Sequence, residues 1–186
     1  QELAVLHDVI DKLMFWMPSG TYGNSTGFTS QSDCSLCPGG KYANANGNTV
    51  CVDCEPGTYS FSSGSADCTP CGIGTYSEKP GQQLCTPCPT GTTLPTLGGK
   101  DLSSCSKCGQ GKYGIPGQSS CFDCTPGYVS EEKGASVCTP CSKGKFANNN
   151  ETAINPSFCE ICSPGTFSES EAAANCVYCS PGSYVS

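Results

Sequence analysis

Nine Cys-x-x-Cys pairs divide this chain of 186 residues into segments of nearly constant length. The pairs begin at residues 34, 51, 68, 85, 105, 121, 138, 159 and 176, so successive pairs are 16 to 21 residues apart. Self-similarity at a short, nearly fixed period is typical of repeat proteins, in which each unit contacts mainly its neighbours. The spacing therefore predicts about nine small modules linked by Cys-x-x-Cys over residues 18–186.

The composition indicates how such modules are stabilised. The chain has 18 cysteines, 23 glycines and 14 prolines, and Leu, Ile, Val and Phe are sparse after residue 17. A chain of this kind cannot bury a large apolar core, so it depends on disulfides, which persist in oxidising compartments. We therefore expect an extracellular protein, either secreted or displayed on a cell surface.

A glycine and an aromatic residue recur at fixed places in the repeat. The glycine stands three residues after the second cysteine of every pair, at Gly40, Gly57, Gly74, Gly91, Gly111, Gly127, Gly144, Gly165 and Gly182. Two residues later stands an aromatic ring at Tyr42, Tyr59, Tyr76, Tyr113, Phe146, Phe167 and Tyr184, with Thr93 and Val129 as the exceptions. Glycine at a fixed turn position indicates a positive φ or a close backbone approach. We expect each ring to pack on a disulfide or on the next turn.

This pattern predicts the fold class. Each unit reads as a turn, a short extended run, a loop and a second short extended run, which together make a small hairpin that is marginal alone. The expected fold is small and disulfide-rich, mostly β or irregular, and forms an elongated tandem array of hairpin modules of about 17 residues each.

Two pairing schemes for the cysteines are consistent with the spacing. Either the second cysteine of each pair bonds the first cysteine of the next pair, or neighbouring pairs bond each other twice. Because the number of pairs is odd, the double scheme leaves a whole pair over, and we favour the first. Each loop that it closes is worth roughly 3 kcal/mol in the chain-entropy model. It gives Cys37–Cys51, Cys54–Cys68, Cys71–Cys85, Cys88–Cys105, Cys108–Cys121, Cys124–Cys138, Cys141–Cys159 and Cys162–Cys176, and it leaves Cys34 and Cys179 unpaired.

The repeated phrase C-x-P-G-x-[YF]-S…G…C-x-x-C resembles the ephrin-receptor-like cysteine-rich repeats of extracellular proteins. It also resembles the smaller cysteine-rich modules of tumour necrosis factor receptors. Similar arrays occur in receptors, in protist surface antigens and in the protein of mastigonemes, the hairs on some algal flagella. The resemblance covers residues 18–186 and implies an extracellular disulfide module without catalytic residues.

Several other functions are disfavoured by the residues themselves. Zinc ribbons have similar cysteine spacing, but nine pairs do not divide into sites of four cysteines. Thioredoxin-like pairs precede a helix, whereas Pro-Gly turns follow the pairs here. The single histidine, His7, leaves no base for nucleophilic catalysis. A net charge of −7 disfavours nucleic acid and anionic lipid, and no apolar run reaches membrane-spanning length. We expect no enzyme activity, metal, cofactor, nucleic-acid partner or membrane insertion.

The first 17 residues have a different pattern. Their apolar residues recur at helical spacing, and Pro18 follows, so we expect an amphipathic helix over residues 1–17. The helix either folds back on the first module or docks on another chain, since large apolar patches mark partner surfaces. The candidate interface residues are Leu3, Leu6, Ile10, Leu13, Phe15, Trp16 and Met17.

The two unpaired cysteines suggest a hypothesis about assembly. Residues 17–34 match residues 88–105, with Met17 in the place of a cysteine, so Cys34 lacks a partner in the first module. Cys179 lacks one in the last module. We expect copies to join head to tail through Cys34 and Cys179, as in a filament, a surface hair or a coat. The alternatives are that a longer repeat protein supplies the missing cysteines, and that the chain is a protein-binding part of a receptor ectodomain or a surface antigen with other extracellular partners.

Two sequons, at Asn24 and Asn150, are candidate N-glycosylation sites.

Overall fold

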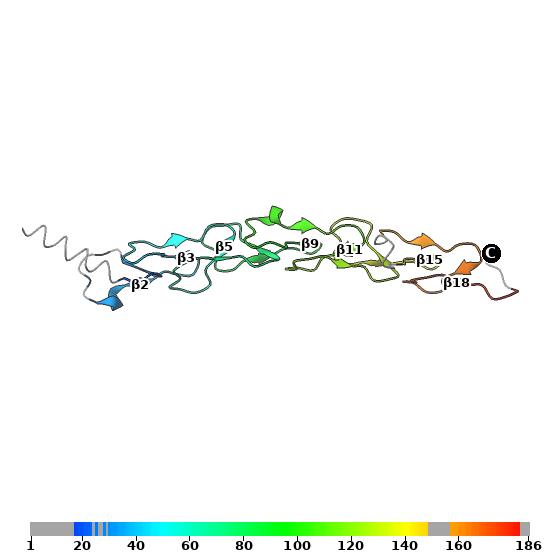
Figure 1. Cartoon of the computed structure of the whole chain (residues 1–186), viewed down its shortest axis with the longest axis horizontal. Coiled ribbons are helices and arrows are strands. Elements are labelled where there is room, and N and C mark those ends of the chain that lie inside the picture. Colours follow the sequence, from blue (N-terminus) through cyan, green and yellow to red (C-terminus); the bar gives the residue numbers. More distant parts are fainter. Residues whose placement is uncertain (1–16, 24, 26–27, 29, 149–156, 183–186) are drawn as a thin grey trace, which may run out of the picture. The chain divides into compact units, whose positions relative to one another are not determined.

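The computed structural model describes residues 17–23, 25, 28, 30–148 and 157–182. In this part of the chain, the regular structure consists of nine two-stranded antiparallel sheets and two 3-10 helices (Figure 1). The predicted disulfide-rich fold of tandem hairpin modules is therefore confirmed. The helix predicted over residues 1–17 lies outside the described residues, except for Met17. We number the hairpins 1 to 9 along the chain.

The chain divides into two compact units, of which the first comprises Gln1–Thr86 and Thr96–Ser104. It contains hairpins 1 to 4, and its two 3-10 helices each precede a Cys-x-x-Cys pair. Its elements are β1 (Thr21–Tyr22), η1 (Gln31–Asp33), β2 (Ser35–Leu36), β3 (Lys41–Tyr42), β4 (Val52–Asp53), β5 (Thr58–Tyr59), β6 (Thr69–Pro70), β7 (Thr75–Tyr76), β8 (Thr86–Pro87) and η2 (Leu102–Ser104).

The second unit comprises Pro87–Pro95 and Cys105–Ser186 and contains the strands of hairpins 5 to 9. Each hairpin again pairs its two strands in antiparallel register, for example Tyr113 with Phe122. The strands are β9 (Thr92–Thr93), β10 (Ser106–Lys107), β11 (Lys112–Tyr113), β12 (Phe122–Asp123), β13 (Tyr128–Val129), β14 (Thr139–Pro140), β15 (Lys145–Phe146), β16 (Glu160–Ile161), β17 (Thr166–Phe167) and β18 (Val177–Tyr178).

A glycine turn begins each hairpin, and we call this residue the turn glycine. The turn glycines of hairpins 1 to 9 all have a positive φ, at Gly20, Gly40, Gly57, Gly74, Gly91, Gly111, Gly127, Gly144 and Gly165. In hairpin 2 the N–H of Cys54 donates to the carbonyl of Gly40 at 2.9 Å, which closes the base of the hairpin. Strands of two residues cannot hold a hairpin together in water, so the stability of each hairpin comes from its neighbours and its disulfides.

The structure pairs the cysteines in the alternating scheme. Each disulfide joins the second cysteine of one pair, at the end of a hairpin, to the first cysteine of the next pair, in the following hairpin. The bonds are Cys37–Cys51, Cys54–Cys68, Cys71–Cys85, Cys88–Cys105, Cys108–Cys121, Cys124–Cys138, Cys141–Cys159 and Cys162–Cys176. Cys34 and Cys179 are unpaired. Consecutive hairpins are thus covalently linked twice, once by the chain and once by a disulfide.

The core of the described residues lies along the disulfides. The second cysteines of the interior pairs are almost completely buried, as is the residue three positions after most turn glycines, which is small in every case but Leu94. The latter residues are Ala43, Ser60, Ser77, Leu94, Ser130, Ala147 and Ser168. The rings, such as Tyr42 and Tyr59, are less completely buried than these residues. The cysteines and the residues three positions after the turn glycines are therefore the most deeply buried part of the repeat.

Candidate functional site

The contact between consecutive hairpins is a backbone hydrogen bond that recurs along the chain. The turn glycine of one hairpin donates to the carbonyl of the third residue after the next turn glycine. In hairpin 3, the N–H of Gly57 donates to the carbonyl of Ser77 at 2.9 Å. The hydroxyl of Ser77 reinforces this contact, because it donates to the carbonyl of Thr58 at 3.0 Å. Ser77 is fully buried, so small polar residues here satisfy backbone groups that water cannot reach.

Most hairpins also contact the second hairpin after them. A second glycine, seven residues after most turn glycines, lies in the loop; we call it the loop glycine. The N–H of loop glycine Gly81 in hairpin 4 donates to the carbonyl of Cys54, at the end of hairpin 2, at 2.9 Å. The same bond joins Gly64 to Cys37 at 2.7 Å. We call this pair of contacts, to the next hairpin and to the one after it, the interlock.

The interlock requires glycine at the turn position because the backbones approach too closely there for a side chain. A Cβ added to Gly40 would lie 2.0 Å from the carbonyl oxygen of Gly81, and Gly40 has a φ of +84°. A Cβ on Gly91 would meet the carbonyl oxygen of Gly134 at the same distance. In hairpin 9 the place of the loop glycine is taken by Ala172, which has a φ of +59°. The seven-residue spacing of the two glycines is visible in the sequence, and it is the signal that sequence reasoning missed.

The turn glycines of hairpins 8 and 9 contact no loop among the described residues. A Cβ built on Gly144 or on Gly165 would meet no described atom within 4 Å, although both residues have the positive φ of the other turn glycines. Cys162 and Cys179 are partly exposed, whereas Cys37, Cys54 and the other interior second cysteines are almost fully buried. At the corresponding positions of earlier hairpins, such as Gly40 and Gly91, a loop glycine packs against the turn glycine.

Met17 occupies the place of a second cysteine. The N–H of Gly47 donates to the carbonyl of Met17 at 2.9 Å, in the same way that the N–H of Gly64 donates to that of Cys37. Met17 is 1% exposed, and a Cβ on Gly23 would clash with its Cε. The predicted interface residue Met17 is thus buried within hairpin 1.

The structure supports the correspondence of residues 17–34 with residues 88–105. In both segments a 3-10 helix, η1 or η2, immediately precedes the first cysteine of a pair. In the later segment that cysteine is Cys105, which is bonded to Cys88. Met17 stands where Cys88 stands, and Cys34 is left without a partner in the chain.

The Met17→Cys variant is expected to gain a ninth disulfide, to Cys34. The reason is that Cys88 and Cys105 are bonded at the corresponding places, so the backbone positions meet the geometric needs of a disulfide. Titration of the single-chain species with a thiol reagent, under denaturing and non-reducing conditions, should give one free thiol per chain in place of the two of the unsubstituted chain. Three free thiols would contradict the correspondence, and the Met17→Leu variant, which should keep two, is the control.

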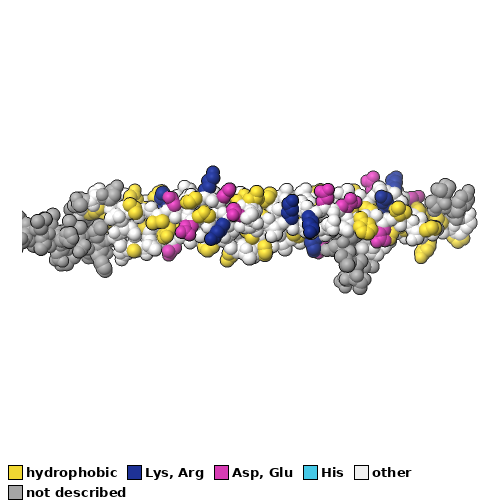
Figure 2. Space-filling model, turned by 90° about the horizontal axis from the view of Figure 1, so that it is seen from above, with side chains coloured by type: hydrophobic (Ala, Val, Ile, Leu, Met, Phe, Trp, Pro, Cys, Tyr) yellow, Lys and Arg dark blue, Asp and Glu magenta, His cyan; other side chains and the backbone are white. Residues whose placement is uncertain are grey.

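Charged side chains of the described residues form no concentrated site. Lys41 and Asp53 pair across hairpin 2 at 2.8 Å, and Lys112 pairs with Asp123 at the equivalent place in hairpin 6. The hydroxyl of Ser103 is the main cause that lowers the pKa of the exposed Asp101 in the loop of hairpin 5. On the face drawn in Figure 2, basic and acidic side chains are interspersed. Among the described residues, no three His, Cys, Asp or Glu side chains are grouped as metal ligands.

Several predicted sites lie outside the described residues. They are the sequon residues Asn24 and Asn150 and the apolar residues Leu3, Leu6, Ile10, Leu13, Phe15 and Trp16. Within the described ranges, no helix has the length and apolar character needed to cross a bilayer.

Comparison with known proteins agrees with the geometry of the hairpins. A sequence model of the family described as "Tyrosine-protein kinase ephrin type A/B receptor-like" matches residues 57–105, which extend from the turn glycine of hairpin 3 to Cys105. These residues form an ephrin-receptor-like cysteine-rich repeat. The search of curated proteins gave no match. Ephrin-receptor-like repeats with this disulfide pattern fit a secreted or surface protein and a non-catalytic module.

Proposed function

We propose that the chain is an extracellular structural protein whose copies join head to tail, as in a filament, a surface hair or a coat. The observation that carries the proposal is the interlock. Consecutive hairpins are joined by a disulfide and in most cases by a backbone hydrogen bond, and the loop glycine of a hairpin commonly bonds the second hairpin before it. An array built this way resists local opening and proteolysis at every module, which suits a structural role.

In the proposed assembly, a loop of a second copy packs on the turn glycines of hairpins 8 and 9. Gly144 and Gly165 contact no loop among the described residues, and Cys162 and Cys179 are partly exposed. A second copy of the chain can supply a hairpin of the same type. Such a contact is heterologous, and repeated without closure it generates a filament.

A covalent bond between Cys179 of one copy and Cys34 of the next would complete the joint. Both cysteines are unpaired within the chain. Their oxidation removes two protons and two electrons, which a small-molecule disulfide such as oxidised glutathione accepts by thiol exchange. Met17 stands at the position that corresponds to the partner cysteine of Cys34. The disulfide therefore requires that Cys179 of the other copy displace the side chain of Met17.

The experiment compares the mass of the oxidised chain with that of two variants in a denaturing gel without reductant. The unsubstituted chain should form species of two or more chains that reductant converts to one. Met17→Cys should stay a single chain because it captures Cys34, and Cys179→Ser should do the same. A chain that stays single, with both thiols free after incubation with oxidised glutathione, would overturn the covalent joint. Sedimentation at neutral pH then decides whether copies of the chain associate through hairpins 8 and 9 without this disulfide.

A protein-binding role, as in a receptor ectodomain or a surface antigen, is the second candidate function. It is favoured by a separate observation, the groove between hairpins 7 and 8 described below. The Met17→Cys variant discriminates the two functions, because it should abolish covalent assembly and leave binding at that groove unchanged.

A further inference from the structure

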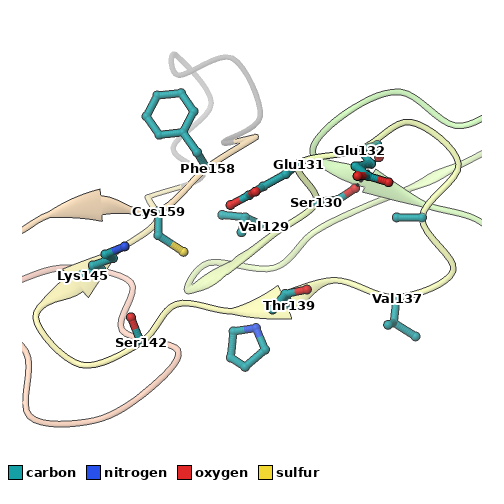
Figure 3. A pocket seen from close by; sticks show the side chains of 12 residues that line it. Val129, Ser130, Glu131, Glu132, Val137, Thr139, Ser142, Lys145, Phe158 and Cys159 are labelled. Carbon is teal, nitrogen blue, oxygen red and sulfur yellow. Dashed lines mark hydrogen bonds between the residues drawn. The ribbon is translucent and has the colours of Figure 1, made fainter.

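A groove of about 500 Å³ opens at the junction of hairpins 7 and 8 (Figure 3). Val129 from β13 and Cys159 lie at its floor, where Val129 packs with the buried Cys141. Glu131 and Glu132 come from the loop of hairpin 7, and Lys145 comes from β15. All of these residues belong to the second unit.

A smaller groove, of about 260 Å³, occupies the equivalent place between hairpins 2 and 3. Its residues correspond to those of the larger groove by position in the repeat. Tyr42 stands where Val129 stands, two residues after the turn glycine, and Cys68 stands where Cys159 stands. Grooves thus occur at two equivalent places of the repeat, and the aromatic ring of Tyr42 lines the one between hairpins 2 and 3. In hairpin 7 valine replaces the ring, and the space is larger.

Hairpin 7 differs from the other hairpins in the chemistry of this floor. Seven of the nine hairpins carry Tyr or Phe two residues after the turn glycine, and hairpin 5 carries Thr93. The hydroxyl of Thr93 lies 3.7 Å from the sulfur of Cys121, so the floor there is polar. Val129 is 3% exposed and makes the floor apolar. An apolar floor without a ring can receive an aromatic side chain from outside.

The rim of the groove adds apolar contact and charge. Phe158 and Val137 line it and are exposed to 60% and 69%. Exposed apolar residues are ordinary when scattered singly, but these two flank one hollow. Glu131 and Glu132 give the rim two negative charges against the single positive charge of Lys145, and the chain as a whole has a net charge of −7. Such a field attracts a cationic partner.

We propose that this groove binds an aromatic side chain of another extracellular protein, presented in a segment with a basic residue on each side of the ring. The ring takes the space that a tyrosine of the repeat fills elsewhere and packs on Val129 and the disulfide Cys141–Cys159. The basic residues pair with Glu131 and Glu132. The proposal concerns hairpins 7 and 8 and does not depend on head-to-tail assembly.

The test uses acetyl-Lys-Phe-Lys-amide as the probe and follows the methyl NMR signals of Val129 and Val137. Acetyl-Lys-Ala-Lys-amide and acetyl-Glu-Phe-Glu-amide are the matched peptides. Burying a phenylalanine ring should make the first peptide bind at least about tenfold more tightly than the alanine peptide. Reversing the charges of the peptide should weaken binding by about threefold or more at low salt.

Val129→Tyr is the decisive variant because it restores the ring that the repeat has elsewhere. It should abolish the response of Val137 to the peptide, while Thr93→Tyr, the same change in hairpin 5, should leave it unchanged. Eight disulfides by mass verify that each variant has folded. If Val129→Tyr fails that check, the Glu131→Gln/Glu132→Gln variant replaces it and should bind about threefold or more weakly.

Three results would overturn the proposal. One is the absence of any shift at about 10 mM peptide, which corresponds to negligible affinity. The second is equal binding of the phenylalanine and alanine peptides. The third is binding that emerges only when residues 149–156 are replaced by a Gly-Ser segment, which would make the chain's own loop the occupant. A response that depends on protein concentration without peptide would assign the groove to a second copy and would contradict the proposal in the same way.

Discussion

Replacing Cys71 and Cys85 together with alanine is expected to lower the free energy of local opening between hairpins 3 and 4 by about 3 kcal/mol. The two residues form a disulfide with a sequence separation of 14. The bond restricts the unfolded chain, and hairpins with two-residue strands have little else to replace it. Hydrogen exchange at the amide of Gly57, which donates to Ser77 of hairpin 4, reports this opening. The exchange should become faster by about a hundredfold.

The unpaired cysteines provide the control for this prediction. Cys34→Ser and Cys179→Ser remove cysteines that bond nothing within the chain, so exchange at Gly57 should stay the same. If the double alanine variant exchanges at the rate of the unsubstituted chain, the disulfide between hairpins 3 and 4 is not what holds them together. The repeat chain opens locally rather than in one step, so a single melting temperature is a poor substitute for this measurement.

The Gly127→Ala variant is expected to release the loop of hairpin 9 from hairpin 7 at a cost of about 3 kcal/mol, which combines the left-handed backbone with overpacking. Gly127 has a φ of +88°, and a Cβ there would lie 2.0 Å from the carbonyl oxygen of Ala172. The amide of Ala172 donates to the carbonyl of Cys141 at 2.8 Å. Its hydrogen exchange should become faster by about a hundredfold when the loop is displaced.

Gly144→Ala is the matched control, because it separates the backbone effect from the close approach. Gly144 is the turn glycine of the next hairpin and has a φ of +79°, yet a Cβ there would meet no described atom within 4 Å. The Gly144→Ala variant should lose only about 1 kcal/mol of stability, because alanine disfavours a left-handed backbone. Hydrogen exchange at the amide of Ala172 should change little. Equal effects of the two alanine variants would show that the contact between hairpins 7 and 9 contributes nothing.

The repeat and its hairpins could be predicted from sequence because they depend on short-range features. The spacing of Cys-x-x-Cys favoured the alternating pairing that the structure has. The glycine three residues after each pair predicted the turns, and Gly40 and Gly57 have the positive φ that this position implies. The replacement of a cysteine by Met17 could also be predicted from the sequence, since residues 17–34 match residues 88–105.

The contact between hairpins two apart was not predicted, although its residues recur in the sequence. The bond between Gly81 and Cys54 depends on the path of a loop back past one complete hairpin, and spacing alone does not reveal this path. The burial of small side chains was not predicted for a related reason. The aromatic rings recur at regular spacing and drew the attention, but the interlock brings the backbones so close that Ala43, Ser60 and Ser77 are more deeply buried than Tyr59.

Val129 of hairpin 7 is an exception to the repeat whose consequence is visible only in the structure. In the sequence, Val129 is one of two departures from the aromatic position. In the structure it is the apolar floor of a groove that is about twice the volume of its counterpart at Tyr42. The departure at Val129 was visible in the sequence. The groove was not, because it depends on how hairpins 7 and 8 pack against each other.

The central claim is that every disulfide joins one hairpin to the next in the alternating order. Peptide mapping by mass spectrometry of the native, unreduced protein tests it most directly. We expect the crosslinked peptides Cys37–Cys51 and Cys54–Cys68 and the equivalent six in the other hairpins, with no link between Cys34 and Cys51. Recovery of Cys34–Cys51 together with Cys37–Cys54 would mean that neighbouring pairs bond each other twice, and it would contradict both the alternating pairing and the absence of a partner for Cys34 within its own chain.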